Sequence, residues 1–237
     1  ASEVPLDEEL KRVVPVIQGI REAGLEATIS IDTRKASVAR KALEAGADWI
    51  NDVSGGEFDP QMLTVASEFL APIVLMHMKG TPETMNSLAT YSEAVVTEVG
   101  DYLLTRRRAA EAAGVPSWNI ILDPGIGFAK TLEHNLSLLR HCGELVAKTQ
   151  PSPLLVGASR KRFIGTILQD VSRNENEPDF KKRSFGNAAA TAIAIAGGAD
   201  LVRVHEAWLC YVLLKVMFIY FPRPMGRSTS GKYVFLS

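Results

Sequence analysis

Six short apolar runs recur along the sequence, and each of them ends in a cluster of polar residues. Each run has the length and composition of a buried strand, so the polar clusters should lie at the carboxyl ends of six strands. Parallel sheets and barrels bind their ligands at that end of the strands. We therefore expect the six clusters to converge on one pocket, although they lie far apart in the sequence. The runs with their clusters are 29–33, 49–53, 74–78, 120–125, 155–161 and 201–205.

Amphipathic stretches separate the runs, which gives a series of strand–helix units. Such a series favours a (β/α)₈ barrel over a doubly wound sheet, because the sequence lacks the glycine fingerprint that a dinucleotide-binding sheet carries after its first strand. The chain opens on a helix, and six strands do not close a barrel that needs eight. We therefore expect an α/β fold that is an incomplete barrel, with six of eight βα units and the first two strands absent. The expected strands are 27–33, 49–54, 72–78, 119–123, 154–158 and 201–205, and the expected helices are 7–24, 35–46, 59–70, 88–113, 133–148 and 186–197.

The composition excludes several classes of protein. The 237 residues fit one large α/β domain, and 46% hydrophobic with 22% charged residues are typical of a globular protein. The net charge of −1 provides no long-range attraction to nucleic acid or to an acidic membrane, so we expect neither as a partner. Two cysteines, Cys142 and Cys210, make no disulfide framework and favour a reducing compartment.

Three of the strand-end residues suit recognition of a flat heterocycle. Asp32, Asn51 and Asp123 end three different strands. Carboxylates accept paired N–H bonds from an edge like that of an aminopyrimidine, and an amide donates and accepts at once. Each residue could instead cap the helix that follows it. Convergence of all three on one pocket favours an amide-rich heterocycle as the ligand over a sugar.

Two apolar side chains could shape the same pocket. Asp123 is followed by a turn with two glycines, which permits close backbone approach to a ligand, and then by Phe128. Phe128 either lines the pocket or packs under the loop. Met76 suits the floor below a planar ring, although an ordinary core methionine is the alternative. We expect the neighbouring His77 to be a hydrogen-bonded core residue and not a catalyst.

A second group of strand-end residues is cationic. Arg160 and Lys161 follow one strand, while Arg203 and His205 flank Val204 and therefore project to the same side of the last strand. This set suits an oxyanion, most simply a phosphate or a diphosphate. The arginine could instead pair with a carboxylate of the heterocycle group. The sequence shows no Cys/His spacing typical of a metal site.

Taken in order, the six clusters resemble those of the dihydropteroate synthase family. The resemblance covers residues 1 to about 206. One motif alone would be weak, whereas six in the same order are highly specific. The motifs are Ile31-Asp32-Thr33, Asn51-Asp52-Val53-Ser54-Gly55-Gly56, Met76-His77-Met78-Lys79-Gly80-Thr81-Pro82, Asp123-Pro124-Gly125-Ile126-Gly127-Phe128, Ser159-Arg160-Lys161 and Arg203-Val204-His205.

The resemblance implies a (β/α)₈ barrel, a role in folate biosynthesis and Mg²⁺ as cofactor. The family joins (7,8-dihydropterin-6-yl)methyl diphosphate to 4-aminobenzoate and releases diphosphate. We expect Lys161, Arg203 and His205 to act on the reacting groups, and Met76 to lie in the substrate site. The resemblance further implies pterin contacts from Asp32, Asn51, Asp123 and Lys161, diphosphate contacts from Arg203 and His205, and aminobenzoate contacts from Phe128 and Lys161.

The chain departs from the family at both ends. The family's first two strands, with the Asn that holds Mg²⁺, have no counterpart, so we expect no metal ligand in this chain and little activity from it alone. We expect residues 1–206 to form the pterin-binding domain. Residues 207–221 are apolar all round, which is atypical of the family's last helix, although the segment is short for a membrane span. Residues 222–237 have the composition of a disordered tail.

Two alternatives to a working synthase remain at the level of sequence. A pterin-dependent methyltransferase barrel would share the Asp and Asn contacts but would have no use for the cationic clusters. A non-catalytic pterin-binding fragment would bind the pterin diphosphate without turnover.

The stretch from Gly80 to Met85 resembles eukaryotic forms, which are commonly fused behind a pterin pyrophosphokinase. The resemblance also implies a homodimer, and either a cytoplasmic or a mitochondrial location.

Overall fold

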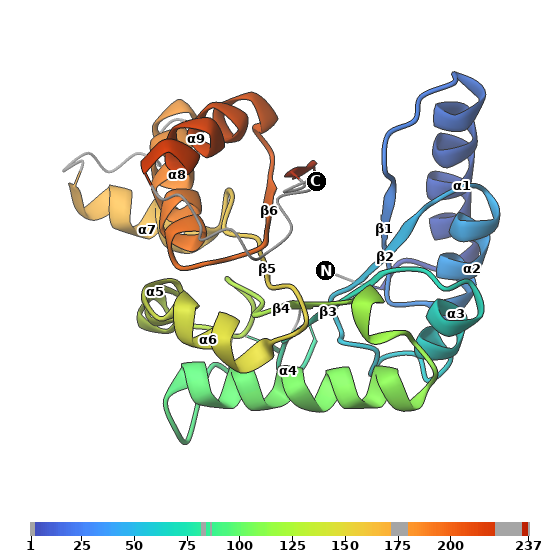
Figure 1. The fold of residues 1–237 in the computed structure, drawn as a ribbon, viewed down its shortest axis with the longest axis horizontal. Coiled ribbons are helices and arrows are strands. Elements are labelled where there is room, and N and C mark those ends of the chain that lie inside the picture. Colours follow the sequence, from blue (N-terminus) through green and yellow to red (C-terminus); the bar gives the residue numbers. More distant parts are fainter. Residues whose placement is uncertain (1–2, 82–83, 86, 172–179, 221–233, 237) are drawn as a thin grey trace.

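The computed structural model describes residues 3–81, 84–85, 87–171, 180–220 and 234–236. Strands and helices alternate along most of this length (Figure 1). The elements are α1 (Leu6–Glu22), β1 (Ser30–Asp32), α2 (Ala36–Glu44), β2 (Trp49–Asp52), α3 (Met62–Glu68), β3 (Ile73–Met76), α4 (Val95–Ala112), the 3₁₀ turn η1 (Ser117–Asn119), β4 (Ile120–Asp123), α5 (Leu132–Arg140), α6 (Cys142–Thr149), β5 (Leu155–Val156), α7 (Arg162–Val171), α8 (Phe180–Ala196), β6 (Leu201–Val204), α9 (Ala207–Tyr220) and β7 (Val234–Leu236).

All strand pairings in the described residues are parallel. One sheet has the order β1-β2-β3-β4, and a second has the order β5-β6-β7. A parallel bridge between Leu122 and Leu154 connects the two. Figure 1 shows the helices on the outside of an arc, with α1 to α3 at one end, α4 to α6 along the middle and α7 to α9 at the other end. The predicted α/β fold with parallel strands is therefore confirmed.

The two faces of the strands are buried in different surroundings. Ile50, Ile73 and Leu122 belong to the large core cluster that also contains buried residues of the helices. The alternate residues of the strands form a separate apolar cluster, which consists of Val74, Ile121, Leu155 and Leu201 with Trp49 packed against it. Because side chains alternate across a strand, this second cluster marks the inner face of the arc. Five strands, β2 to β6, contribute to it.

Several helix boundaries differ from those expected. The expected helix 88–113 begins only at Val95, and the expected helix 133–148 is broken into α5 and α6, which meet at His141. α7 was not predicted, although Phe163 and Ile164 are buried and are followed at helical spacing by partly buried Ile167 and Leu168. These apolar residues directly follow the polar cluster Ser159-Arg160-Lys161, so the sequence alone does not separate the helix from that cluster.

Two elements follow His205 in the described residues. Residues 207–220 form α9, which packs against α8. The expectation of a disordered tail is wrong for Val234–Leu236, because these residues form β7 and pair with β6 in the register Arg203–Phe235. The remainder of the tail, 222–233 and 237, lies outside the described residues. No helix of the described chain is long and apolar enough to cross a membrane.

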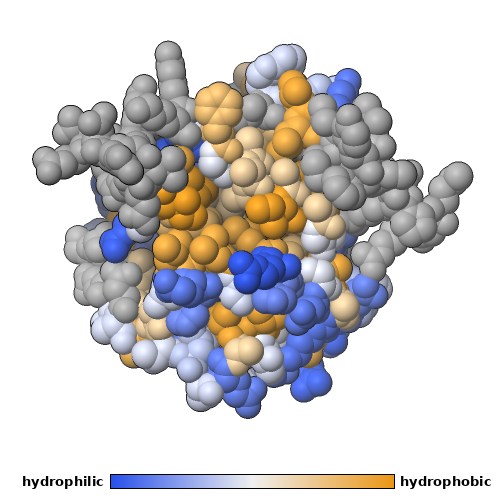
Figure 2. Space-filling view, turned by 90° about the vertical axis from the view of Figure 1, so that its left-hand side faces the viewer, coloured by the Kyte–Doolittle hydropathy of each residue, from blue (hydrophilic) through white to orange (hydrophobic). Residues whose placement is uncertain are grey.

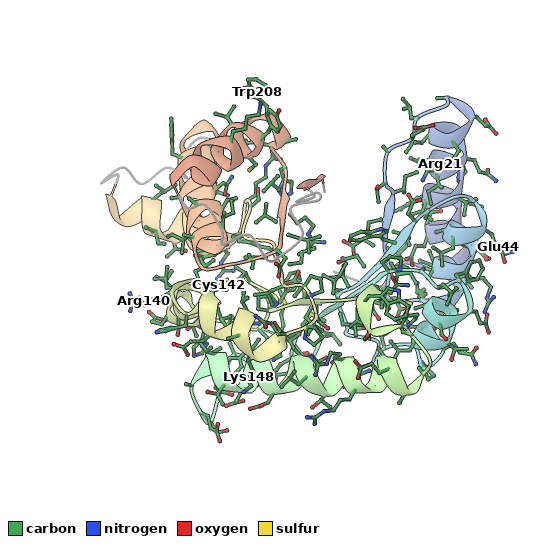
Figure 3. The ribbon with its side chains drawn as sticks, in the orientation of Figure 1. Arg21, Glu44, Arg140, Cys142, Lys148 and Trp208 are labelled. Carbon is green, nitrogen blue, oxygen red and sulfur yellow. The ribbon has the colours of Figure 1, made fainter. Side chains whose placement is uncertain are left out.

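The outer surface is uneven in polarity. Figure 2 shows hydrophobic residues gathered on the part of this face formed by the last helices, above a polar lower half. Phe185 of α8 and Trp208 of α9 are 80% and 77% exposed. Figure 3 shows Lys148 of α6 beside α4, where its Nζ lies 2.8 Å from Oδ1 of Asp101. Such ion pairs join neighbouring helices on the outside of the arc.

Candidate functional site

The inner apolar cluster determines which side chains meet at the carboxyl ends of the strands. Residues of one strand that are two positions apart share a face. The residue two positions after each inner apolar residue is therefore also directed inward. On β2, β3, β4 and β6 these residues are Asn51, Met76, Asp123 and Arg203. Four of the predicted site residues thus form one layer, directly above the apolar one.

The polar groups of Asn51 and Asp123 lie buried in this layer. The two residues are 6% and 2% exposed. Oδ1 of Asp123 accepts a hydrogen bond from the backbone N–H of Gly125 at 2.7 Å. Burial raises the pKa of the Asp123 carboxyl, while the Arg203 guanidinium, the Gly125 N–H and the Lys161 ammonium oppose this shift. Within the described residues, Nδ2 of Asn51 is buried without a hydrogen-bond partner, which leaves a donor for a ligand.

Arg203 also reaches the end of β1. Its Nη1 lies 3.4 Å from Oδ2 of Asp32. The Asp32 side chain is 60% exposed, so the pair contributes little to stability. The ion pair between Arg203 and a carboxylate of the heterocycle group, the alternative that the sequence left open, is therefore present. It uses one nitrogen of a guanidinium that has five N–H donors, so other donors remain for a ligand.

Lys161 lies beside the aromatic ring of Phe128. The Nζ of Lys161 is 3.9 Å from the ring centroid, a cation–π distance. Burial lowers the pKa of Lys161 to about 8; Asp123 opposes this shift and Arg203 adds to it. The lysine can take this path because residue 127 is glycine: a Cβ there would lie 2.9 Å from Cδ of Lys161. Phe128 therefore lies against the site and does not merely pack under its loop.

His205 is held by the loop after β5. Its Nδ1 lies 3.1 Å from Oγ of Ser159, and its backbone N–H donates to the same oxygen at 3.3 Å. Burial lowers the pKa of His205, and the positive charges of Arg160, Arg203 and Lys161 act in the same direction. The two cationic clusters found in the sequence are therefore adjacent in space.

Lys130 lies beside the candidate site, and the sequence did not single it out. Its Nζ lies 2.9 Å from Nδ1 of His77 and donates to the backbone carbonyl of Phe128 at 2.9 Å. Burial lowers the pKa of Lys130 to about 7. His77 is itself buried, with a pKa lowered to about 3 by burial and by two neighbouring lysines. It is therefore the hydrogen-bonded core histidine that the sequence predicted.

The part of the chain that the structure describes contains no group of three or more His, Cys, Asp or Glu side chains placed to hold a metal ion. The two carboxylates near the cations do not make one, because Asp32 contacts Arg203 and Asp123 binds the Gly125 N–H. These residues do not fit a magnesium site by themselves.

The geometry can be compared with known proteins. A family model described as "pterin binding enzyme" matches residues 1–205. The chain belongs to this family. A dihydropteroate synthase of Synechocystis is 48% identical over 216 residues, which are 91% of this chain and 71% of that enzyme. A folic acid synthesis protein of Pneumocystis carinii is 41% identical over 215 residues, which are 90% of this chain but only 28% of that protein.

Solved structures of the pterin-binding family agree. The dihydropteroate synthase of Xanthomonas albilineans in complex with 7,8-dihydropteroate superimposes with a TM-score of 0.81 at 36% identity, covering 93% of this chain and 77% of that one. The enzyme of Thermus thermophilus in complex with 4-aminobenzoate gives 0.80 at 40% identity, covering 92% and 79%. The predicted resemblance to dihydropteroate synthases is confirmed, and the match to the family model ends at His205.

Proposed function

We propose that this chain carries the substrate-binding body of a dihydropteroate synthase, a transferase of folate biosynthesis. The reaction joins (7,8-dihydropterin-6-yl)methyl diphosphate to 4-aminobenzoate and releases diphosphate. One observation carries the proposal: the inner layer above the apolar cluster puts Asn51 and Asp123 beside Arg203. A heterocycle site and an anion site therefore adjoin, as a pterin that bears a diphosphate requires.

The heterocycle half supplies matched hydrogen-bonding groups. Asp123 offers carboxylate oxygens, and Asn51 offers the unpartnered Nδ2. Both groups are buried, where hydrogen bonds to a ligand compete least with water. Asp32 is the more exposed third contact, and Met76, which is 1% exposed, packs below the ring.

The anion half fits the chemistry of the leaving group. The bond between the pterin methylene carbon and a diphosphate oxygen breaks, and the electron pair leaves with the oxygen. Arg203, His205 and Lys161 stabilise the negative charge that develops there. The amine nitrogen of 4-aminobenzoate forms the new bond to carbon and then loses a proton to solvent. An arylamine is already unprotonated near neutral pH, so this step needs placement against Phe128 and Lys161 more than it needs a base.

We propose Mg²⁺ as the cofactor, and this proposal does not require a complete metal site within this chain. Magnesium commonly binds through substrate phosphates with only one or two carboxylates from the protein. We propose that the ion accompanies the diphosphate and that its protein ligand comes from outside the described residues.

The architecture and the setting of the protein are also proposals. We infer an incomplete (β/α)₈ barrel of six βα units, with residues 1–206 as the pterin-binding domain. The inner face shared by β2 to β6 supports this, while among the described residues no pairing joins β1 to β6 or β7. A mitochondrial folate synthesis bifunctional protein of Arabidopsis thaliana is 38% identical, and this chain spans 38% of its length. The bifunctional relative supports our proposal of a fused second enzyme, which we propose is a pterin pyrophosphokinase. A homodimer and a cytoplasmic or mitochondrial location are further proposals.

Calorimetry and product analysis test the function together. The 237-residue chain should bind the pterin diphosphate, and release little diphosphate with Mg²⁺ and 4-aminobenzoate, because no pairing joins β1 to β6 or β7 among the described residues. Rapid turnover would refute the expected inactivity and leave the family function intact. A methyl transfer from methyltetrahydrofolate would favour the methyltransferase alternative. Absence of any binding of the pterin diphosphate would refute the assignment of the site.

A further inference from the structure

Lys130 is a charged side chain that the reaction described above does not use. It lies in the loop between β4 and α5, and its Nζ points back to the end of β3. There it lies 2.9 Å from Nδ1 of His77, which is 53 positions away in sequence. The same Nζ donates to the carbonyl of Phe128, two residues before it. One ammonium group therefore connects two strand ends.

The loop that carries Phe128 has an unusual backbone. Gly125, Gly127 and Ala129 all have positive φ, at 66°, 82° and 49°. A non-glycine residue in the left-handed region is disfavoured, so the contacts around Ala129 must hold it there. One such contact is the hydrogen bond from the Tyr91 hydroxyl to the Ala129 carbonyl, at 3.0 Å. Lys130 follows Ala129 directly, and its Nζ donates to the carbonyl of Phe128, the residue before Ala129.

The loop geometry matters for the site because it determines where the Phe128 ring lies relative to Lys161. The Phe128 ring contacts Nζ of Lys161, and both residues adjoin the position proposed for 4-aminobenzoate. A loop without its fixed end would let the ring move away from Lys161. The contact between Lys130 and the Phe128 backbone is therefore coupled to the aromatic wall of the second-substrate site.

We propose that Lys130 is a positioning residue: its ammonium group joins the Phe128 carbonyl to the His77 imidazole and so fixes the ring that lines the aminobenzoate site. The inference rests on the proposed function for the identity of that substrate. It does not make Lys130 a catalytic residue, because its Nζ is engaged by protein groups.

The proton of Lys130 is held in a crowded electrostatic setting. Asp123 on β4 favours the ammonium form, whereas Lys161 after β5 and Lys79 after β3 disfavour it. His77 is neutral at neutral pH, so its Nδ1 accepts from the ammonium and its Nε2 carries the hydrogen. With a pKa of about 7, the ammonium should lose its proton within the neutral range, and its charge-assisted bond to His77 should weaken as the pH rises.

Nuclear magnetic resonance of the His77 ring tests this contact without any substrate. In the whole chain, the Nδ1 shift of His77 should move with a midpoint near pH 7, while the circular dichroism stays constant. Lys130→Met should abolish this step, and Lys130→Arg should keep the hydrogen bond but remove the titration. Lys148→Met is the control, because Lys148 makes an ion pair on the outer surface. A His77 signal that is the same in wild type and Lys130→Met would overturn the proposal.

Two ligands test the consequence for the site. 7,8-Dihydropteroate carries both the pterin and the aminobenzoate, whereas 6-hydroxymethyl-7,8-dihydropterin carries the pterin alone. Lys130→Met should weaken binding of the first about tenfold and Lys130→Arg should restore most of it. Binding of the second should change by less than about threefold in either variant. Equal losses for both ligands would contradict a role at Phe128. If the wild type binds neither, the proposed function fails, while the His77 signal still decides the role of Lys130.

Discussion

Nη1 of Arg203 lies 3.4 Å from Oδ2 of Asp32, although 171 positions separate the two residues in sequence. The contact joins the end of β6 to the end of β1, two strands that do not pair with each other in the described part of the chain. It also joins the proposed anion half of the site to the proposed heterocycle half. Substitution of this arginine therefore tests whether the proposed anion half can be separated from the heterocycle half.

Arg203→Ala should weaken binding of the pterin diphosphate by about 30-fold or more. In the complex the guanidinium and the diphosphate form a charge pair, and removal of one partner from a buried pair commonly costs about 2 kcal/mol or more. The Arg203 side chain is only 17% exposed, so water would replace the guanidinium poorly. Calorimetry with the pterin diphosphate and with the pterin alcohol measures the effect. The alcohol should lose much less, because it lacks the anion.

A matched control separates this effect from a general loss of charge. Arg12 makes an exposed pair with Glu8 on α1, and its side chain is 64% exposed. Arg12→Ala removes the same charge and should leave the affinity unchanged within error. Equal losses in the two variants, or none in Arg203→Ala, would refute the anion-binding role.

Asn51→Ala should reduce pterin affinity by about tenfold without a matching loss of stability. A hydrogen bond to the ligand is lost, worth about 1–1.5 kcal/mol. In the free protein, however, the substitution removes a buried Nδ2 that has no partner among the described residues. Removing an unsatisfied donor offsets the cost of the smaller side chain. Urea denaturation and calorimetry on the same sample measure the two quantities.

Asn135 provides the opposite case. Its side chain accepts from the Gly127 N–H and donates to the Thr131 carbonyl, both at 2.7 Å. Asn135→Ala leaves the Gly127 N–H without this acceptor and should cost about 1–3 kcal/mol of stability. If Asn51→Ala destabilises the protein as much as Asn135→Ala does, then the Asn51 amide is satisfied in solution and our account of it is wrong.

The convergence of the site could be predicted because it depends on periodicity. Side chains alternate along a strand, so the residue that ends each apolar run shares a face with the inner residue two positions earlier. Asn51, Asp123 and Arg203 follow this rule, and the structure brings them together. Order along the chain adds specificity, because the six clusters occur in the order that is typical of one family.

The residues that the sequence did not reveal depend on contacts outside this periodicity. A lysine in a loop is usually exposed, and nothing local to Lys130 indicates its contact with His77, 53 positions away. β7 is three residues long and follows a segment of basic and small residues, so no alternation indicates it. Its partner is the edge of β6, and the pairing is visible only in three dimensions.

Binding of the anion should decrease as the pH rises through about 8, since burial lowers the pKa of Lys161 to that value and only the ammonium form attracts diphosphate. Stability should respond in the opposite direction. Between pH 8 and the ordinary lysine pKa, the unfolded chain binds the proton that the folded chain has lost, so stability rises with pH in this range. Lys161→Arg should remain charged, so it should remove the decrease in anion binding and reduce the rise in stability, to which Lys130 also contributes. Calorimetry and urea denaturation from pH 6.5 to 9.5 would detect them, and parallel profiles for the two proteins would contradict the assignment.

Gly125→Ala should unfold the loop or the protein. Gly125 has φ of 66°, and a Cβ at this position would lie 2.0 Å from the backbone carbonyl oxygen of His77. The left-handed backbone alone costs an alanine about 1–2 kcal/mol, and contact with a buried backbone atom cannot be relieved by rotating a side chain.

Gly19 in α1 is the matched control, since a Cβ there meets no atom within 4 Å. Gly19→Ala should stabilise the protein by about 0.5–1 kcal/mol, because glycine is a poor helix former. Urea midpoints that shift in the same direction for both variants would show that the close approach of this loop to β3 does not exist in solution.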